Sequence, residues 1–425
     1  MVGRAMSAGP LHGYRASEPR WGWRVLGGLV VLLALASALL IVQLLRTPPA
    51  LRVSVVLAAR ARVGANAPVL PWPARGSAAV EVVGVGSLRS FRGDLVTPLA
   101  SLTKLMTALV VLKRHPLGTS DSGPTIRITA ADVATYRADV ASDQSVLEVR
   151  AGEDLSEREA LEGLLVPSAN NVALVLARWD AGSTSAFVAR MNTMARSLGL
   201  RHTHFVEPSG LAPDDAGTAI DMTHLGADAL ANPTIASIVD LGEVSLPVAG
   251  TVINYDYDVG HHGIIGIKTG SSSAAGGNFV FAARRTISGR TLTVVGAVLR
   301  QEGTSDLDTA LEMGERLAAA ALHSVRPLVV LRAGTSAVRI RARWSSTAIL
   351  GRTTRTVHIF GTPGRVAALR TVLSPTLTHG HPRRIQRGER LATITITLAG
   401  RTYTVPVTAA GKLPGPTLHY RLTRF

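Results

Sequence analysis

The chain has 425 residues, of which 46% are hydrophobic, so it can form two or three domains with sizeable cores and is not a disordered protein. It has no cysteine, which excludes disulfides, thiolate zinc sites and cysteine nucleophiles. Arginine supplies most of the net charge of +16, but only 4% of the residues are aromatic and no basic run is interleaved with them, which argues against binding of single-stranded nucleic acid.

The first 45 residues are typical of a membrane anchor. Residues 1–24 carry four arginines and one acid, and Trp21 and Trp23 stand just before an apolar run, as at a membrane interface. Residues 25–45 contain no charge and, as a helix, are long enough to span the roughly 30 Å hydrocarbon core. By the positive-inside rule we expect residues 1–24 to be cytoplasmic and the rest of the chain to lie outside a cell membrane that it crosses once. The alternative is a signal peptide cleaved near residues 36–38, although the apolar run continues beyond them.

A proline-rich stretch separates this anchor from a first domain. Residues 46–76 contain five prolines and few helix signals, so we predict a semi-stiff linker. A domain over 77–323 follows, with strand patterns at both ends and helix patterns between them. This order predicts an α+β domain with an antiparallel sheet flanked by helices. The strand patterns cover 78–85, 264–269, 278–283 and 291–299, and the helix patterns cover 101–114, 156–165, 172–179, 187–198 and 305–322.

The last hundred residues have a different pattern. Residues 326–425 contain short alternating strands such as 338–344 and 391–398, which predict a separate all-β domain. This domain carries 17 lysine and arginine residues against a single acid, Glu389. Its basic surface is either simply solvated or binds anionic wall polymers or lipid headgroups.

A serine and a lysine in the helix pattern over 101–114 fit a nucleophile and its base. Ser101 and Lys104 are three residues apart, so they face the same side of a helix. A serine hydroxyl is a weak nucleophile until a base takes its proton. A lysine can take it only when neutral, a state that burial and a second positive charge nearby both favour. We therefore expect Ser101 to be the nucleophile and Lys104 the general base.

The second motif, Ser168-Ala169-Asn170, falls in a predicted loop between two helices. Ser168 is placed to relay a proton to a leaving amine. Asn170 carries both a donor and an acceptor, so it could position Lys104 or a substrate amide.

The third motif, Lys268-Thr269-Gly270, falls on a predicted strand. Lys268 would attract a terminal carboxylate, and Thr269 would donate a hydrogen bond to it. Gly270 would let a peptide substrate lie along the strand. Each of the three motifs is common alone, but their joint order and structural context indicate a catalytic site.

These motifs and their flanks resemble the low-molecular-mass penicillin-binding proteins, the D-alanyl-D-alanine carboxypeptidases of peptidase S11 type. The resemblance covers about 78–323 and implies the serine β-lactamase/DD-peptidase fold. It implies a serine DD-peptidase that removes the terminal D-alanine of peptidoglycan stem peptides and is acylated by β-lactams. It further implies that the backbone N–H groups of Ser101 and Ser271 form the oxyanion hole. The flanks that carry it are 165–171, 205–211 and 266–277.

Two features depart from the β-lactamase pattern. Ala169 replaces the aspartate of the second motif, and the loop that would carry a deacylating glutamate has no suitable carboxylate. Rapid hydrolysis of an acylated β-lactam is therefore not expected. Arg300, after the last strand pattern, is the candidate for binding the substrate carboxylate.

The alternatives concern the fate of the acyl group and the use of the groove. The same site could serve a DD-transpeptidase or endopeptidase, or an idle sensor that binds peptidoglycan without turnover. No cofactor is expected. A metal site is not expected either, because the pairs His202 with His204 and His261 with His262 lack metalloenzyme spacing and a carboxylate partner.

Overall fold

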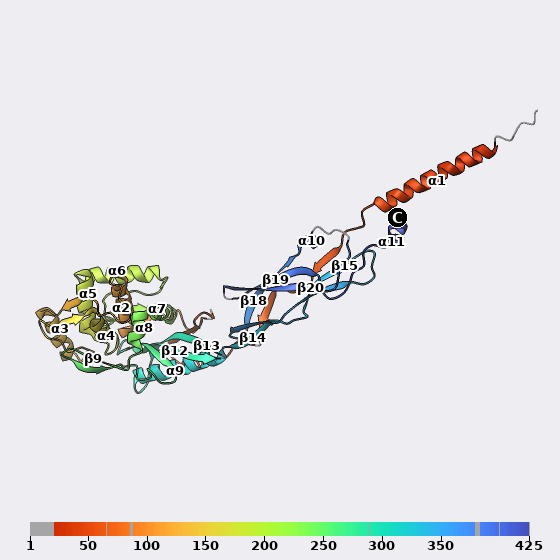
Figure 1. Ribbon diagram of the computed structural model, residues 1–425. Coiled ribbons are helices and arrows are strands. Elements are labelled where there is room, and N and C mark those ends of the chain that lie inside the picture. The colour runs from red at the N-terminus through yellow and green to blue at the C-terminus, as the bar shows by residue number, and fades with distance from the viewer. Residues whose placement is uncertain are drawn as a thin grey trace, which may run out of the picture.

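The computed structural model describes residues 21–64, 66–85, 88–287, 289–378, 383–398 and 400–424. Figure 1 shows an elongated molecule with α1 (Trp21–Leu45) at one end, a sheet-rich region in the middle and a region of mixed helices and strands at the other end. Residues 1–20 of the predicted cytoplasmic tail lie outside the described part of the chain.

The helix α1 contains the predicted membrane segment and begins at Trp21, within the predicted tail. None of its residues is buried by the rest of the protein. It is the one helix among the described residues that is long and apolar enough to cross a membrane. A helix that is apolar on all sides and has few protein neighbours is suited to a lipid environment.

A five-stranded antiparallel sheet organises the mixed region. Its strand order is β11-β12-β13-β3-β4, so β11 lies at one edge. Side chains alternate along β12: Phe281 packs with α9 (Asp306–Ser324) on one face, and Val280 packs with α7 (Ala219–Ala231) on the other. Helices therefore flank the sheet on both faces, which confirms the predicted α+β class. The strands are β3 (Ser77–Val82), β4 (Arg89–Phe91), β11 (Ile264–Ser272), β12 (Gly276–Ile287) and β13 (Arg290–Gln301).

The helix α2 (Thr103–Arg114) lies at the centre of the helical part, as its apolar sequence predicted. Nine of its 12 residues are buried, and a 3-10 turn, η1 (Ala100–Leu102), precedes it.

The helices α3, α7 and α8 were not among the predicted elements. The other helices are α3 (Ala130–Ala141), α4 (Glu157–Leu165), α5 (Asn170–Ala181), α6 (Thr184–Ser197) and α8 (Pro233–Val239). Short strand pairs join β5 (Thr97–Pro98) to β8 (Ala216–Gly217), β6 (Thr125–Arg127) to β7 (Asp154–Ser156), and β9 (Glu243–Leu246) to β10 (Gly250–Ile253).

The predicted linker over 46–76 is wrong in its first half. β1 (Arg52–Val55) pairs with β15 (Ser336–Arg341), and β2 (Arg60–Val63) pairs with β18 (Arg365–Leu373). Both are antiparallel pairs, and β1 and β2 form the two edges of a seven-stranded sheet of order β1-β15-β16-β20-β19-β18-β2. The segment before the mixed region therefore completes the sheet that follows it.

The rest of this sheet comes from the C-terminal residues that were predicted to form strands. The last helix, α11 (Leu418–Thr423), lies beside the end of α1. Gln43 Nε2 of α1 donates a hydrogen bond of 2.6 Å to the carbonyl of Arg424, the residue that follows α11. The other C-terminal elements are β14 (Arg326–Leu331), β16 (Ile349–Thr353), β17 (Val357–Gly361), α10 (Pro375–Thr378), β19 (Arg390–Leu398) and β20 (Arg401–Ala409).

Candidate active site

The three sequence motifs meet at one cavity. It has a volume of about 140 Å³ and lies where η1, the loop before α5 and the edge strand β11 come together. Five of the predicted site residues line it, and Ser145, Tyr255 and Leu307 complete its wall. The five are Ser101, Ser168, Thr269, Gly270 and Ser271.

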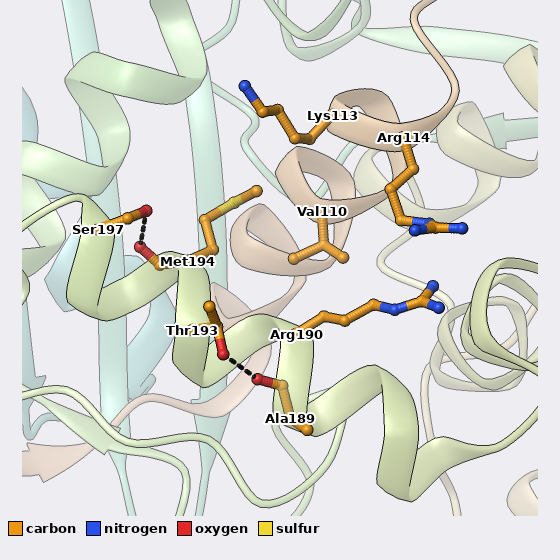
Figure 2. A pocket seen from close by; sticks show the side chains of 8 residues that line it. All are labelled: Val110, Lys113, Arg114, Ala189, Arg190, Thr193, Met194 and Ser197. Atoms are coloured by element: carbon orange, nitrogen blue, oxygen red, sulfur yellow. Dashed lines mark hydrogen bonds between the residues drawn. The ribbon is translucent and has the colours of Figure 1, made fainter.

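A larger cavity of about 400 Å³ lies between α2 and α6 (Figure 2). None of the predicted site residues lines it. Arg114 and Arg190 line it, but both form ion pairs with the buried carboxylate of Asp180. This cavity offers no nucleophile paired with a base, so it is not the candidate active site.

Lys104 is completely buried and contacts three oxygen atoms. Its Nζ lies 2.8 Å from Ser101 Oγ, 2.6 Å from Asn170 Oδ1 and 2.7 Å from the carbonyl of Ser209. Burial, and then the positive charge of Lys268, hold the pKa of Lys104 well below its ordinary value. Both effects favour the neutral amine over the ammonium form of this side chain.

A neutral amine has two N–H groups and one lone pair. Asn170 Oδ1 and the Ser209 carbonyl can only accept hydrogen bonds, so they take both N–H groups of Lys104. The lone pair then faces the Ser101 hydroxyl, which can donate to it. This is the arrangement that a general base needs toward its nucleophile.

Ser168 and Asn170 lie at the start of α5, where Ser168 lines the cavity and Asn170 contacts Lys104 behind it. Ser168 has a φ of 61°, in the left-handed region that a non-glycine residue rarely occupies. Its hydroxyl is buried and has no hydrogen-bond partner among the described residues. Asn170 is fixed by a backbone hydrogen bond of 2.8 Å to the Ser145 carbonyl and by donation from its side-chain amide to Gln144 Oε1 at 3.2 Å. A strained residue with an unpaired hydroxyl, next to a fixed amide, is typical of a functional site.

The strand β11 forms the opposite wall. Lys268 is only 2% exposed, and burial lowers its pKa to about 7 despite the opposing charge of Asp256. Among the described residues, its Nζ donates a hydrogen bond only to the neighbouring Thr269 carbonyl, at 3.1 Å. A Cβ at Gly270 would lie 2.8 Å from the backbone nitrogen of Ser101. Only glycine therefore lets β11 approach η1 this closely.

Two carboxyl groups behind Lys104 were not among the predicted site residues. Glu207 accepts hydrogen bonds from the Ser209 N–H at 2.7 Å and the Leu211 N–H at 2.6 Å, so it orders the loop whose carbonyl contacts Lys104. Asp215 is fully buried, and burial together with Glu207 raises its pKa to about 8. Glu207 stands within the flank that carried the family resemblance, and this was the one available signal for it.

Arg300 does not line the cavity. Its side chain is about half exposed, and its Nε lies 3.7 Å from a carboxylate oxygen of Glu302. The structure therefore does not support Arg300 as the group that binds the substrate carboxylate. The described residues contain no group of three or more histidine and acidic side chains arranged to hold a metal ion.

Comparison with known proteins gives matches in the same region. The model of the D-alanyl-D-alanine carboxypeptidase family, peptidase S11, matches residues 88–299. The chain is 37% identical over 163 residues to a D-alanyl-D-alanine endopeptidase of Pseudomonas aeruginosa, covering 38% of this chain and 49% of that protein. It is 34% identical over 208 residues to the D-alanyl-D-alanine carboxypeptidase DacB2 of Mycobacterium tuberculosis, covering 47% and 66%.

A third relative is covered more completely. The chain is 32% identical over 216 residues to a D-alanyl-D-alanine carboxypeptidase of Streptomyces sp. strain K15, covering 47% of this chain and 71% of that protein. The chain spans less than two thirds of the length of the relatives from Pseudomonas aeruginosa and Mycobacterium tuberculosis.

Solved structures show the same fold. The Streptomyces K15 DD-transpeptidase aligns with a TM-score of 0.52 and 26% identity, covering 60% of this chain and 99% of that one. Penicillin binding protein 5 from Haemophilus influenzae aligns with a TM-score of 0.56 and 20% identity, covering 83% of this chain and 100% of that one. At this identity the second likeness concerns the fold alone. Together they confirm the predicted fold.

Proposed function

Because the chain belongs to the D-alanyl-D-alanine carboxypeptidase family, peptidase S11, we propose that it is a serine-type D-Ala-D-Ala carboxypeptidase that acts through an acyl-enzyme on Ser101. Its substrates would be peptidoglycan stem peptides that end in D-Ala-D-Ala, and β-lactams would be covalent inhibitors. The observation that carries the proposal is the buried Lys104, whose lowered pKa favours the neutral amine and whose Nζ lies 2.8 Å from Ser101 Oγ.

The reaction would begin with proton transfer from Ser101 to Lys104. Ser101 Oγ then attacks the carbonyl carbon of the penultimate D-alanine, and the negative oxygen that forms is stabilised by the backbone N–H groups of Ser101 and Ser271. The C–N bond breaks as Ser168 donates its proton to the leaving amine and takes up the proton held by Lys104, so that D-alanine departs and Lys104 is neutral again. Water, with Lys104 again as base, would hydrolyse the resulting ester and restore Ser101.

Substrate binding would use the free edge of the five-stranded sheet. No other described strand pairs with the outer side of β11, so an extended peptide can add there as a further strand. The protonated form of Lys268 and the hydroxyl of Thr269 would attract the terminal carboxylate. With a pKa of about 7, Lys268 can hold the necessary proton at neutral pH, and the carboxylate would favour that form.

The membrane would hold the enzyme beside its substrate. We take α1 as a single membrane anchor with a cytoplasmic N-terminus, so that the cavity lies outside the cell. The contact of α11 with the end of α1 would bring the basic C-terminal sheet near the membrane surface. Anionic lipid headgroups or wall polymers are the ligands that its charge would attract.

Hydrolysis of a model peptide tests this function. The full-length protein in detergent should release D-alanine from diacyl-L-Lys-D-Ala-D-Ala, and Ser101→Ala should release none above background. Release of D-alanine by Ser101→Ala at the wild-type rate would contradict the acyl-enzyme on Ser101. If wild type binds the peptide but releases no D-alanine, an idle sensor is the better account.

The main alternative activity is endopeptidase cleavage of cross-linked peptides, because one matched relative is a D-alanyl-D-alanine endopeptidase. Cross-linked peptidoglycan dimers distinguish the two activities, since an endopeptidase converts them to monomers. A transpeptidase would instead transfer the acyl group to an added amino acid rather than to water.

A further inference from the structure

An irregularity in the sheet lies directly behind the nucleophile. At Asn278 on β12 the register with β13 shifts between Gly277 and Phe279, so that β13 has one extra residue there. Arg300, one of the two β13 residues opposite Asn278 in this bulge, has a φ of 56° in the left-handed region. Bulges of this kind are often found beside active sites, where they redirect a side chain.

Opposite the bulge stands Asn278, whose side chain is fully buried and makes three hydrogen bonds to backbone. Its Nδ2 donates to the carbonyl of Pro98 at 3.1 Å and to the carbonyl of Leu99 at 3.0 Å. Its Oδ1 accepts from the N–H of Arg300 at 2.8 Å. Both N–H groups of the amide are used, and their two acceptors are the carbonyls just before η1.

Asn278 stands opposite Gly270 in the ladder between β11 and β12. Directly paired residues on antiparallel strands project to the same face. On that face Gly270 has no side chain, so the backbone of η1 packs against β11, and the amide of Asn278 binds the residues that lead into it. One side chain therefore connects β12, the strand paired with the one that carries Ser271, to the segment that carries Ser101.

The segment between Asn278 and the nucleophile is strained. Ala100 has a φ of 50°, a left-handed conformation that a non-glycine residue keeps only when its surroundings hold it there. The Leu99 N–H donates to the Asp215 carbonyl at 2.8 Å, so Asn278 holds one side of this segment and Asp215 the other. Without the amide, the backbone N–H of Ser101 would no longer be fixed relative to that of Ser271.

We propose that Asn278 is a positioning residue that sets the geometry of the oxyanion hole. The inference rests on the proposed function, because it concerns the two N–H groups that would bind the oxyanion. It assigns to Asn278 no contact with substrate. Replacement of Asn278 should therefore lower the rate of acylation and leave the initial, noncovalent binding of ligand unchanged.

Asn278→Asp tests this role, because it keeps the shape and the Oδ1 acceptor but replaces the donating amide with oxygen that repels both carbonyls. Benzylpenicillin is mixed with the full-length protein in detergent, and the noncovalent dissociation constant and the acylation rate constant are measured separately. We expect the rate constant to fall about 100-fold or more, as when an oxyanion donor is lost, with the dissociation constant changing less than threefold. The affinity for a peptide boronic acid, which places a tetrahedral oxygen in the hole, should fall with the acylation rate.

Asn192→Asp is the matched control. Asn192 makes the same kinds of hydrogen bond, with two donated to the carbonyls of Val188 and Phe205 and one accepted from the Phe205 N–H, but it does not line the cavity. This variant should acylate within threefold of wild type. The inference is wrong if the acylation rate constant of Asn192→Asp falls as far as that of Asn278→Asp. It is also wrong if Asn278→Asp acylates at the wild-type rate.

Asn278→Ser provides a second test if the aspartate variant does not fold. Its hydroxyl can donate to only one of the two carbonyls, so the acylation rate should be reduced, again without weaker noncovalent binding. A wild-type rate in this variant would overturn the inference. If wild-type protein itself is not acylated, the proposed function is contradicted. If wild type is acylated and the Asn278 variants react at the same rate, only the role of Asn278 is contradicted.

Discussion

At the scale of single residues, the proposed chemistry depends on a lysine that carries no charge. In the described part of the chain, no carboxylate lies within hydrogen-bond distance of Lys104; its contacts are an amide oxygen, a carbonyl and a hydroxyl. These oxygens can bind a neutral amine, so none of these contacts requires Lys104 to carry the additional proton that would prevent it from acting as a base. The positive charge of Lys268 further disfavours that proton.

Lys104→Arg should abolish this base while leaving a long basic side chain in place. A guanidinium does not lose its proton at any relevant pH, so acylation by benzylpenicillin should fall by at least about 100-fold, the usual range for loss of a general base. Lys113→Arg on the same helix is the control, because Lys113 is exposed and lies outside the candidate site, and it should react as wild type does. Similar rates for wild type and Lys104→Arg would show that Lys104 is not the base.

The pKa of Lys268 predicts how ligand binding depends on pH. Burial depresses this pKa to about 7, so the ammonium is present below pH 7 and lost as the pH rises above it. The noncovalent dissociation constant for benzylpenicillin should therefore be constant below pH 7 and increase by up to about tenfold per pH unit above it. Benzylpenicillin methyl ester, which has no carboxylate, serves as the matched ligand and should show no such increase. The same pH dependence for both ligands would exclude Lys268 as the carboxylate partner.

At the scale of elements, the close approach of β11 to η1 determines the shape of the cavity. Gly270→Ala would place a Cβ 2.8 Å from the nitrogen of Ser101, against backbone that cannot easily move. We expect at least about a tenfold loss in acylation rate, because displacement of this backbone also displaces an oxyanion donor.

The control for Gly270→Ala is Gly242→Ala, since a Cβ at Gly242 meets no atom within 4 Å. It should acylate normally, and both rates can be read from stopped-flow mixing with a chromogenic β-lactam. Normal acylation by Gly270→Ala would show that β11 and η1 can move apart without lowering the acylation rate.

Sequence patterns predicted the helix and strand that carry the candidate site, because the side chains of these elements have recognisable patterns. The apolar run of α2 indicated a buried helix, and the residue types at Ser101, Lys104 and Lys268 indicated the chemistry. The parts that sequence did not predict are backbone contacts, such as the Ser209 carbonyl that binds Lys104 and the carbonyls that bind Asn278. Any residue type can supply a carbonyl, so such partners leave no pattern. The Arg300 expectation was based on position after a strand, which does not fix the direction of a long side chain.

At the scale of the whole molecule, the chain folds back to complete its own second sheet. β1 and β2 each have four residues, half of the residues in β2 are arginine, and their partners are about 300 residues away in sequence. Strands this short and polar at a sheet edge resemble a loop in sequence, which is why a linker was predicted. The mixed region is thus an insertion between two parts of one sheet (Figure 1).

Val63→Asp tests whether β2 belongs to that sheet. Val63 is fully buried in the hydrophobic core of the C-terminal region, so a charge there should destabilise this region by about 3 kcal/mol or more. Limited proteolysis should then cleave within 326–425 more rapidly, while acylation of Ser101 continues. Arg62→Asp on the same strand is the control, because Arg62 is exposed and its replacement should not change the cleavage rate. Equal protease resistance of the two variants would favour a linker.

The central claim is that Ser101 becomes the acylated residue, and intact mass after reaction with benzylpenicillin tests it most directly. Wild-type protein should gain the mass of one penicilloyl group, and peptide mapping should place it on Ser101. Ser101→Ala should gain nothing, while Ser145→Ala, which removes a different hydroxyl from the cavity wall, should still be labelled. A penicilloyl adduct on Ser101→Ala, or its location elsewhere in wild-type protein, would contradict the account.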